Sequence, residues 1–159
     1  PRGDPRRNLT RLERILIDEG PLPRGQLLAM PVDAGNPGVA ATEYQRRLEA
    51  VAGRPLTLDL VQLGLGTDGH TASLVPGDPV LEVRSDPVAL TGLYQGHRRL
   101  TMTYPVLDAA GARVWWVESA APGQAKAQAA SALLAGDRSV PAGWVERAET
   151  TVVIDAGDG

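Results

Sequence analysis

The residues best able to do chemistry lie in one glycine-rich run, Leu63-Gly-Leu-Gly-Thr-Asp-Gly-His-Thr-Ala-Ser-Leu-Val-Pro-Gly77. The run contains Asp68 and His70, and His70 is one of only 2 histidines in the chain. An imidazole whose ordinary pKa is near ~6.5 can act as a neutral base at pH 7, and a carboxylate two residues earlier can orient it or bind a substrate hydroxyl. The run therefore predicts a site that activates water.

The glycines of this run predict close approach of a ligand to the backbone. Gly64, Gly66 and Gly69 permit tight turns, and a helix starting after the run would present N–H groups to an anion or an oxyanion. Gly66, Gly69 and Thr71 are therefore candidate substrate contacts. A glycine-rich turn after a strand is also a common plain connection, so the residues alone leave both interpretations open.

Other chemistries find no support in the sequence. The chain has no cysteine, which excludes disulfides, thiol nucleophiles and thiolate metal sites, and 2 histidines make a histidine-rich metal site unfavourable. There is no Gly-x-Ser-x-Gly elbow and no Walker loop. A dinucleotide fingerprint is a poor fit, because no acid follows the run at the usual distance on a second strand. We therefore expect no metal and no nicotinamide cofactor.

The elements around the run predict an α/β domain. The run follows the apolar segment 56–65, which we expect to be a central parallel strand covered on both faces. Further strands are expected at 26–30, 88–94, 98–103, 113–118 and 150–154, and helices at 9–19 (capped by Asn8), 40–52 and 122–134. This alternation predicts a Rossmann-like three-layer domain with a mainly parallel sheet, to which 88–103 could add antiparallel edge strands. Ligands bind at the carboxyl ends of such strands, where Asp68 and His70 follow.

Composition limits the partners and the location. With 159 residues the chain fits one domain, residues 1–159. It has 16 Lys and Arg against 19 Asp and Glu, and this net charge of -3 disfavours binding to nucleic acid or to anionic membranes. No apolar run is long enough to span a bilayer, and residues 1–8 lack the apolar segment of a secretion signal. We expect a soluble cytoplasmic protein.

A longer stretch, Asp59-Leu-Val-Gln-Leu-Gly-Leu-Gly-Thr-Asp-Gly-His-Thr-Ala-Ser-Leu-Val-Pro-Gly77, resembles the signature of the 6-phosphogluconolactonases. Three further pieces resemble the family in the same order: Ala41-Thr-Glu-Tyr44, Arg98-Arg-Leu-Thr-Met-Thr-Tyr-Pro-Val-Leu-Asp-Ala-Ala110 and Gly123-Gln-Ala-Lys126. The resemblance implies hydrolysis of 6-phospho-D-glucono-1,5-lactone in the oxidative pentose phosphate pathway, without metal or organic cofactor. His70 matches the family's proposed base and Asp68 its adjacent acid. Arg99 and Lys126 match cationic residues near the sugar phosphate, although either could be a plain surface charge.

The sequence also departs from the family pattern. It contains neither the Ser-Gly-Gly-Ser type of phosphate loop nor the Trp-x-Asp-Glu-Arg stretch that precede the shared region in the family. We therefore expect the first strands of the sheet and one wall of the phosphate site to be missing, which would leave a strand edge open to self-association. Two alternatives stay open: a non-catalytic sugar-phosphate binding or assembly module, and a glucosamine-6-phosphate deaminase-like isomerase. The second is disfavoured because Leu74-Val75 replaces a pair that bears an ionisable group in the deaminases.

Overall fold

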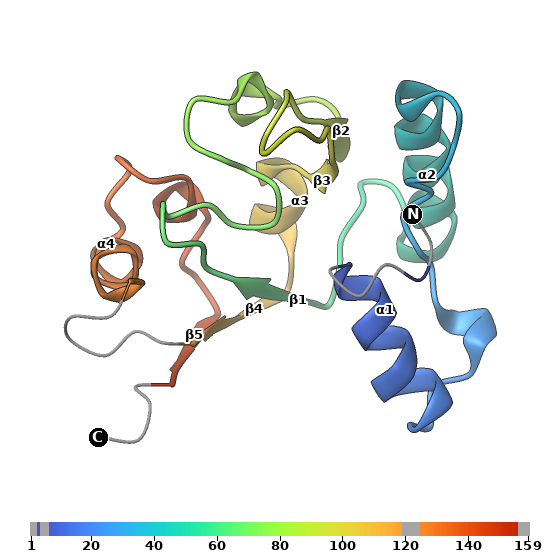
Figure 1. Ribbon diagram of the computed structural model, residues 1–159, viewed down its shortest axis with the longest axis horizontal. Coiled ribbons are helices and arrows are strands. Elements are labelled where there is room, and N and C mark those ends of the chain that lie inside the picture. The colour runs from blue at the N-terminus through green and yellow to red at the C-terminus, as the bar shows by residue number, and fades with distance from the viewer. Residues whose placement is uncertain (1–2, 4–6, 119–124, 156–159) are drawn as a thin grey trace.

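The computed structural model describes residues 3, 7–118 and 125–155 (Figure 1). The helices are α1 (Asn8–Leu12), which continues as a π-helical turn over Glu13–Asp18, α2 (Pro37–Ala52), α3 (Tyr104–Ala109) and α4 (Ala127–Ala135). The strands are β1 (Leu60–Gly64), β2 (Val88–Leu90), β3 (Leu100–Met102), β4 (Ala112–Val117) and β5 (Thr150–Ile154). Short 3-10 turns occur at Arg24–Gln26, Pro79–Glu82 and Pro141–Trp144.

A parallel sheet holds the middle and the end of the chain together. Its strand order is β1-β4-β5, both pairings are parallel, and Trp115 in β4 lies opposite Leu63 on one side and Val152 on the other. This confirms the α/β class and the mainly parallel sheet. The expected strand at 56–65 is present and parallel, but only residues 60–64 pair with a neighbouring strand. It is not central among the described strands: β4 lies in the middle of the sheet and β1 at its edge.

The remaining two strands form a separate antiparallel pair. Val88 in β2 lies opposite Met102 in β3, and Leu90 lies opposite Leu100. This confirms the antiparallel interpretation of the stretch 88–103. Backbone hydrogen bonds continue the hairpin beyond the regular strands, from the Thr91 amide to the Arg99 carbonyl and in both directions between Tyr94 and His97. The hairpin therefore extends well past β2 and β3 and ends in a tip at residues 94–97.

In the described residues, one face of the parallel sheet is covered and the other is open. Side chains alternate between the two faces of a strand, so Val61, Leu63, Trp115 and Val117 point to the same side and are buried. They pack in one cluster with α3 and α4, to which Leu107 and Leu133 belong among others. On the other side, Leu60 is 56% exposed, Trp116 50% and Val153 36%. The expectation of a strand covered on both faces is therefore not met within these residues.

A second core cluster joins α2 to the antiparallel hairpin. Its buried members come from α2 and its surroundings, from β2 and β3 and from α3: Ala40, Ala41, Tyr44, Leu48, Leu56, Val88, Leu100 and Val106. The Asn36 side chain accepts hydrogen bonds from the amides of Gly38 and Val39, and Pro37 occupies the first helical position. These two signals start α2 at residue 37 instead of the expected 40. Figure 1 shows α2 on the side of the molecule opposite to α4.

Several expected elements are corrected near the N-terminal end. The segment 26–30 forms no described strand: residues 24–26 make a 3-10 turn, and Leu28 and Met30 pack against the second cluster. Asn8 is the first residue of α1 and does not cap it, since Arg7 occupies the N-cap position and no side chain bonds there. Of the expected helix at 122–134, the described part starts at Ala127, and residues 119–124 lie outside the described range.

A buried arginine joins three elements on the covered side of the sheet. Arg113 in β4 is 2% exposed. Its guanidinium donates hydrogen bonds to the backbone carbonyls of Leu107 (2.7 Å), Asp108, Ala110 (3.0 Å) and Ala148 (2.6 Å). These carbonyls belong to the last turn of α3, the residue after it and the segment before β5, so one side chain fixes α3 and β5 relative to β4.

Candidate functional site

The conspicuous glycine-rich run follows the carboxyl end of β1 and folds back on itself. The amide of Gly66 donates to the carbonyl of His70 (2.8 Å), and the amide of Gly69 donates to the carbonyl of Gly66 (3.1 Å). The hydroxyl of Thr71 donates to the carbonyl of Gly64 (3.0 Å). The expected helix does not start here, because turns follow until the 3-10 turn at Pro79–Glu82. These amides therefore stabilise the turn itself instead of facing a ligand as a helix N-terminus would.

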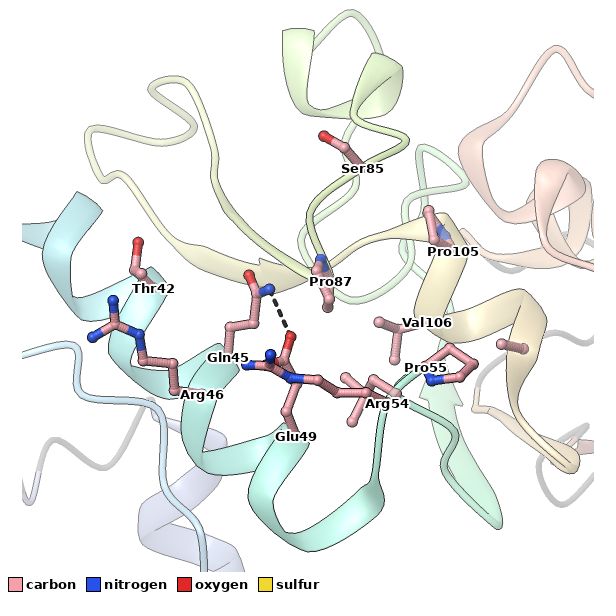
Figure 2. Close-up of a pocket in the computed structure, with 12 residues that line it drawn as sticks. Thr42, Gln45, Arg46, Glu49, Arg54, Pro55, Ser85, Pro87, Pro105 and Val106 are labelled. Atoms are coloured by element: carbon pink, nitrogen blue, oxygen red, sulfur yellow. Dashed lines mark hydrogen bonds and ion pairs between the residues drawn. The ribbon is translucent and has the colours of Figure 1, made fainter.

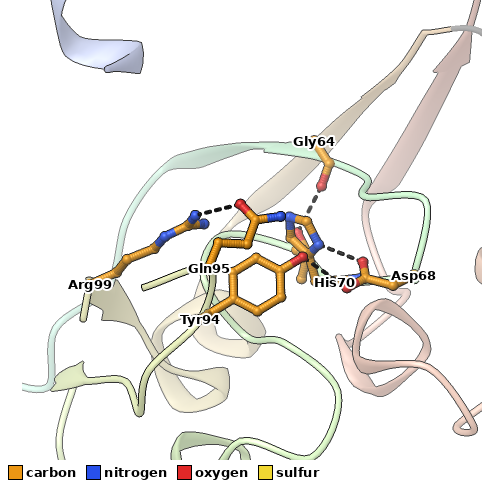
Figure 3. A network of polar contacts seen from close by, with 7 residues as sticks. Gly64, Asp68, His70, Tyr94, Gln95 and Arg99 are labelled. Carbon is orange, nitrogen blue, oxygen red and sulfur yellow. Dashed lines mark hydrogen bonds and ion pairs between the residues drawn. The ribbon is translucent and has the colours of Figure 1, made fainter. Parts of the chain in front are cut away.

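Asp68 and His70 form a close pair at this turn (Figure 3). The Nδ1 atom of His70 lies 2.5 Å from Oδ1 of Asp68, and the same oxygen accepts the backbone amide of His70 at 3.1 Å. The side chains are partly accessible, at 25% for His70 and 35% for Asp68. A ligand in solvent can therefore reach the pair, which the sequence had predicted to act together.

The protonation of the pair follows from the charge of Asp68. Partial burial raises the pKa of Asp68, but hydrogen bonds from the His70 amide and ring and from Tyr94 outweigh it, so that this pKa lies below its ordinary value. The carboxylate is therefore ionised at neutral pH and can only accept hydrogen bonds. Nδ1 of a neutral His70 must then carry the proton, which leaves Nε2 with a free lone pair for a proton from water.

Gly66 makes room for the imidazole. A Cβ atom at this position would lie 2.1 Å from Nδ1 of His70, 2.3 Å from its Cε1 and 2.7 Å from Oδ1 of Asp68. A Cβ atom does not approach other non-bonded atoms this closely, so any side chain at residue 66 would displace the pair. The glycine that the sequence predicted to contact substrate thus has a second function, which is to let the ring lie directly against the backbone.

Gly69 anchors the turn to the segment before β5. Its φ angle is +77°, and a Cβ atom there would lie 2.5 Å from Cβ of Val140. The amide of Ala142 donates to the carbonyl of Gly69 at 3.0 Å. The 3-10 turn at Pro141–Trp144 that contains this amide also packs against α4. The turn that carries Asp68 and His70 is therefore attached to the 3-10 turn at Pro141–Trp144 and, through it, to α4.

Tyr94, which the sequence did not indicate as a site residue, contacts both members of the pair. The hydroxyl of Tyr94 donates to Oδ2 of Asp68 at 3.2 Å, and its ring meets the His70 ring edge-on with centroids 5.8 Å apart. Desolvation and the neighbouring Asp68 charge raise the pKa of Tyr94, which keeps the phenol protonated and able to donate. Tyr94 lies 26 residues from Asp68 in the chain, so no local motif indicates the contact.

The hairpin tip that carries Tyr94 has a well-defined turn. Gln95 and Gly96 both have positive φ angles, +51° and +78°, as a two-residue type I′ turn requires. Gly96 is the local signal for this turn, whereas Gln95 is not a residue type that favours a positive φ angle, so the sequence indicates the turn only weakly. Because the turn fixes the hairpin register, it also fixes where Tyr94 meets Asp68.

The candidate cations differ in how they relate to this cluster. The guanidinium carbon of Arg99 lies 4.9 Å from the centre of the Tyr94 ring, and its Nη2 lies 3.5 Å from Oε1 of Gln95. Arg99 is thus connected to the Asp68–His70 pair through Tyr94. Lys126 occupies the half-buried N-cap position of α4, and the hydrogen bonds of the cluster do not include it. Thr71 is inaccessible to solvent and its hydroxyl donates to the Gly64 carbonyl, so its side chain supports the turn, and its contact with a ligand stays a prediction.

Two cavities of the described residues lie away from this cluster. One, with a volume of about 520 Å³, lies between α2 and the segments around Pro55, Pro87 and Pro105 (Figure 2). Glu49 in its wall binds Gln45 at 2.9 Å and pairs with Arg54. The other, about 660 Å³, lies between α1 and the segment 27–34. Neither is lined by His70, and in the described residues no group of three or more His, Asp or Glu side chains could hold a metal ion.

Fold and site together define an α/β domain with an accessible histidine–carboxylate pair beyond the carboxyl end of a parallel strand. A family model described as glucosamine-6-phosphate isomerases/6-phosphogluconolactonase matches residues 1–154. The chain belongs to this family.

Individual relatives agree with the family match. The chain is 34% identical over 148 residues to a 6-phosphogluconolactonase from a Nostoc species, covering 90% of this chain and 61% of that protein. It is 35% identical over 165 aligned residues to a 6-phosphogluconolactonase from Mycobacterium tuberculosis, covering 98% of this chain and 66% of that protein. The chain thus spans less than two thirds of the length of these relatives.

Solved structures share the fold. A 6-phosphogluconolactonase from Thermotoga maritima superposes with a TM-score of 0.79 at 22% identity, over 97% of this chain and 66% of that one. A monomeric glucosamine-6-phosphate deaminase superposes with a TM-score of 0.76 at 16% identity, over 96% of this chain and 66% of that one. Since lactonase and deaminase share the fold, the fold alone does not choose between the two reactions.

Proposed function

We propose that this chain carries the hydrolytic site of a 6-phosphogluconolactonase, which converts 6-phospho-D-glucono-1,5-lactone to 6-phosphogluconate. The observation that carries the proposal is the 2.5 Å contact between Asp68 and Nδ1 of a His70 ring that solvent can reach. The two relatives described above align with 90% and 98% of the chain, and both are 6-phosphogluconolactonases. This supports the proposed substrate.

In the proposed reaction, Nε2 of His70 takes a proton from a water molecule as its oxygen attacks the lactone carbonyl carbon. A C–O bond forms and the carbonyl oxygen becomes an oxyanion. When the tetrahedral intermediate collapses, the bond from this carbon to the ring oxygen breaks and the imidazolium returns its proton to the ring oxygen. The product is an open-chain acid, which ionises in solution. Asp68 stabilises the transient imidazolium through Nδ1.

The deaminase-like alternative has less support. Leu74 and Val75 replace the pair of residues that bears an ionisable group in the glucosamine-6-phosphate deaminases. Both side chains are buried, at 0% and 3% exposed. Apolar side chains there cannot move a proton during opening of an amino-sugar ring and isomerisation. Hydrolysis of a lactone needs no group at that place.

The test is the rate of 6-phosphogluconate formation from freshly prepared lactone, measured with a coupled dehydrogenase and corrected for spontaneous opening. We expect His70→Ala to lower kcat/KM by at least ~100-fold, the lower end for a positioned general base. His97→Ala is the matched control, because His97 is exposed at the hairpin and its described hydrogen bonds are made by its backbone. Lactone opening no faster than background in the wild-type chain, with 6-phosphogluconate still bound, would instead favour the non-catalytic binding module.

The remaining expectations about partners and location are part of the same proposal. Within the described sheet β1 has a strand partner on one side only, and Leu60 on it is exposed, which supports self-association through this edge. Sedimentation at several concentrations would detect it. None of the described helices has the length and apolar character to cross a membrane. The single-domain organisation and the cytoplasmic location stay predictions.

A further inference from the structure

We propose that Tyr94 is a positioning residue with two separable functions: its hydroxyl holds Asp68 against His70, and its ring holds Arg99 beside the pair. The inference rests on the proposed function, because it assigns the parts of one side chain to separate steps of that reaction. Its basis is a continuous series of contacts, from Nδ1 of His70 through Asp68 and Tyr94 to Arg99 (Figure 3).

The hydroxyl acts on the carboxylate oxygen that His70 leaves free. Oδ1 of Asp68 accepts both the ring and the backbone amide of His70, while Oδ2 accepts the Tyr94 hydroxyl. With a side chain 35% exposed, Asp68 has solvent available as a competing donor and is free to rotate unless both oxygens are held. The Tyr94 bond supplies the second point of attachment. It thereby keeps Oδ1 directed at Nδ1 and keeps Nε2 as the basic atom.

The ring acts on Arg99. The guanidinium carbon lies 4.9 Å from the ring centre, within the range of a cation–π contact, while the described polar bond of the guanidinium to Gln95 is long at 3.5 Å. The ring therefore contributes much of what orients this arginine. The ring does not accept the N–H groups as a carboxylate would, so those of the guanidinium that do not face Gln95 can bind an anionic group of the substrate.

The two functions predict different kinetic effects. Tyr94→Phe keeps the ring and removes the hydroxyl, so kcat should fall about fivefold while KM stays within about twofold, as expected for loss of a charge-assisted bond that is partly exposed. Tyr94→Leu removes both, so the same loss of kcat should be joined by a rise in KM of about tenfold. A residue that only supports folding would not separate kcat from KM in this way.

A double-mutant cycle tests whether the hydroxyl acts through Asp68. In an Asp68→Asn background, Tyr94→Phe should change kcat by less than about 1.5-fold, because the group it positions is already lost. Tyr44→Phe is the matched control: its hydroxyl donates to the Leu28 carbonyl at 2.9 Å, in the second core cluster, and its loss should leave kcat and KM unchanged. An unchanged kcat for Tyr94→Phe, or a full fivefold loss repeated in the Asp68→Asn background, would overturn the inference.

A spectroscopic measurement separates this inference from the proposed function. Long-range proton–nitrogen NMR spectra of the imidazoles report which ring nitrogen carries the proton, with His97 as an internal reference. We expect Tyr94→Phe to lower the Nδ1–H fraction of His70 and to leave His97 unchanged. If the wild-type chain is inactive but Tyr94→Phe causes this shift, the lactonase proposal is refuted and the positioning role stands. If the chain is active but the shift is absent, the positioning role is refuted and the lactonase proposal stands.

Discussion

Replacing Gly66 by alanine would test the geometry of the site with a single methyl group. The new Cβ would lie 2.1 Å from Nδ1 of His70, whereas ordinary contact begins near 3.4 Å, so the ring would have to move by about 1.3 Å, the difference between these two distances. A misplacement of about 1 Å in a reacting group can cost about 100-fold in rate. We therefore expect Gly66→Ala to lower kcat by roughly 100-fold, close to the effect of removing His70.

The chain contains a closely matched control two residues earlier. A Cβ atom at Gly64 would meet nothing within 4 Å, so Gly64→Ala adds the same methyl group without touching the pair. Lactone hydrolysis should then remain within about threefold of wild type for Gly64→Ala, and both variants should melt within a few degrees of wild type, since neither glycine has a positive φ angle. A Gly66→Ala protein that hydrolyses the lactone at a near wild-type rate would refute the placement of His70 against the backbone.

Two further predictions concern the charges. Arg113→Met should lower the free energy of unfolding in urea by at least about 3 kcal/mol, because four carbonyl groups lose their donor. Arg98→Met, at an exposed position, should change it by less than about 0.5 kcal/mol, and equal urea midpoints for the two variants would contradict this prediction. Arg99→Gln and Lys126→Gln should each weaken 6-phosphogluconate binding by roughly 1.5 to 3 kcal/mol in calorimetric titrations if the cation contacts the ligand. Unchanged dissociation constants would make either residue a surface charge.

Elements with a strong period or a strong local signal could be predicted from the sequence. β4 and β5 fall within one residue of the expected 113–118 and 150–154, because runs rich in valine and tryptophan or threonine favour strands. The residues 26–30 are equally apolar but do not form a strand. Apolar content buries a segment, whereas a strand also needs a neighbour with free hydrogen-bonding groups, and the local sequence does not reveal the neighbour.

From the residue pattern alone, without the family resemblance that indicated Arg99, the site could be predicted only where its residues are close in sequence. The two-residue spacing of Asp68 and His70 lets one carboxylate bind both the ring and the amide of the histidine, and this contact is local. Tyr94 reaches the same carboxylate through the hairpin register, which depends on the turn at Gln95 and Gly96. The expectation of a helix directly after the run was wrong, because turns follow it as far as Pro79–Glu82, and the amides of Gly66 and Gly69 bond within the run itself.

The buried Arg113 also determines how the fold responds to acid. Its described hydrogen-bond acceptors are all peptide carbonyls, which do not take up protons at any pH at which proteins are studied. A guanidinium bound to a carboxylate would lose its partner on acidification, but this junction between α3, β4 and β5 keeps its full set of bonds. The bonds of Arg113 to these carbonyls therefore survive acidification, although Asp108 beside it takes up a proton before Asp68 does, because burial raises the pKa of Asp108 above its ordinary value whereas the pKa of Asp68 lies below it.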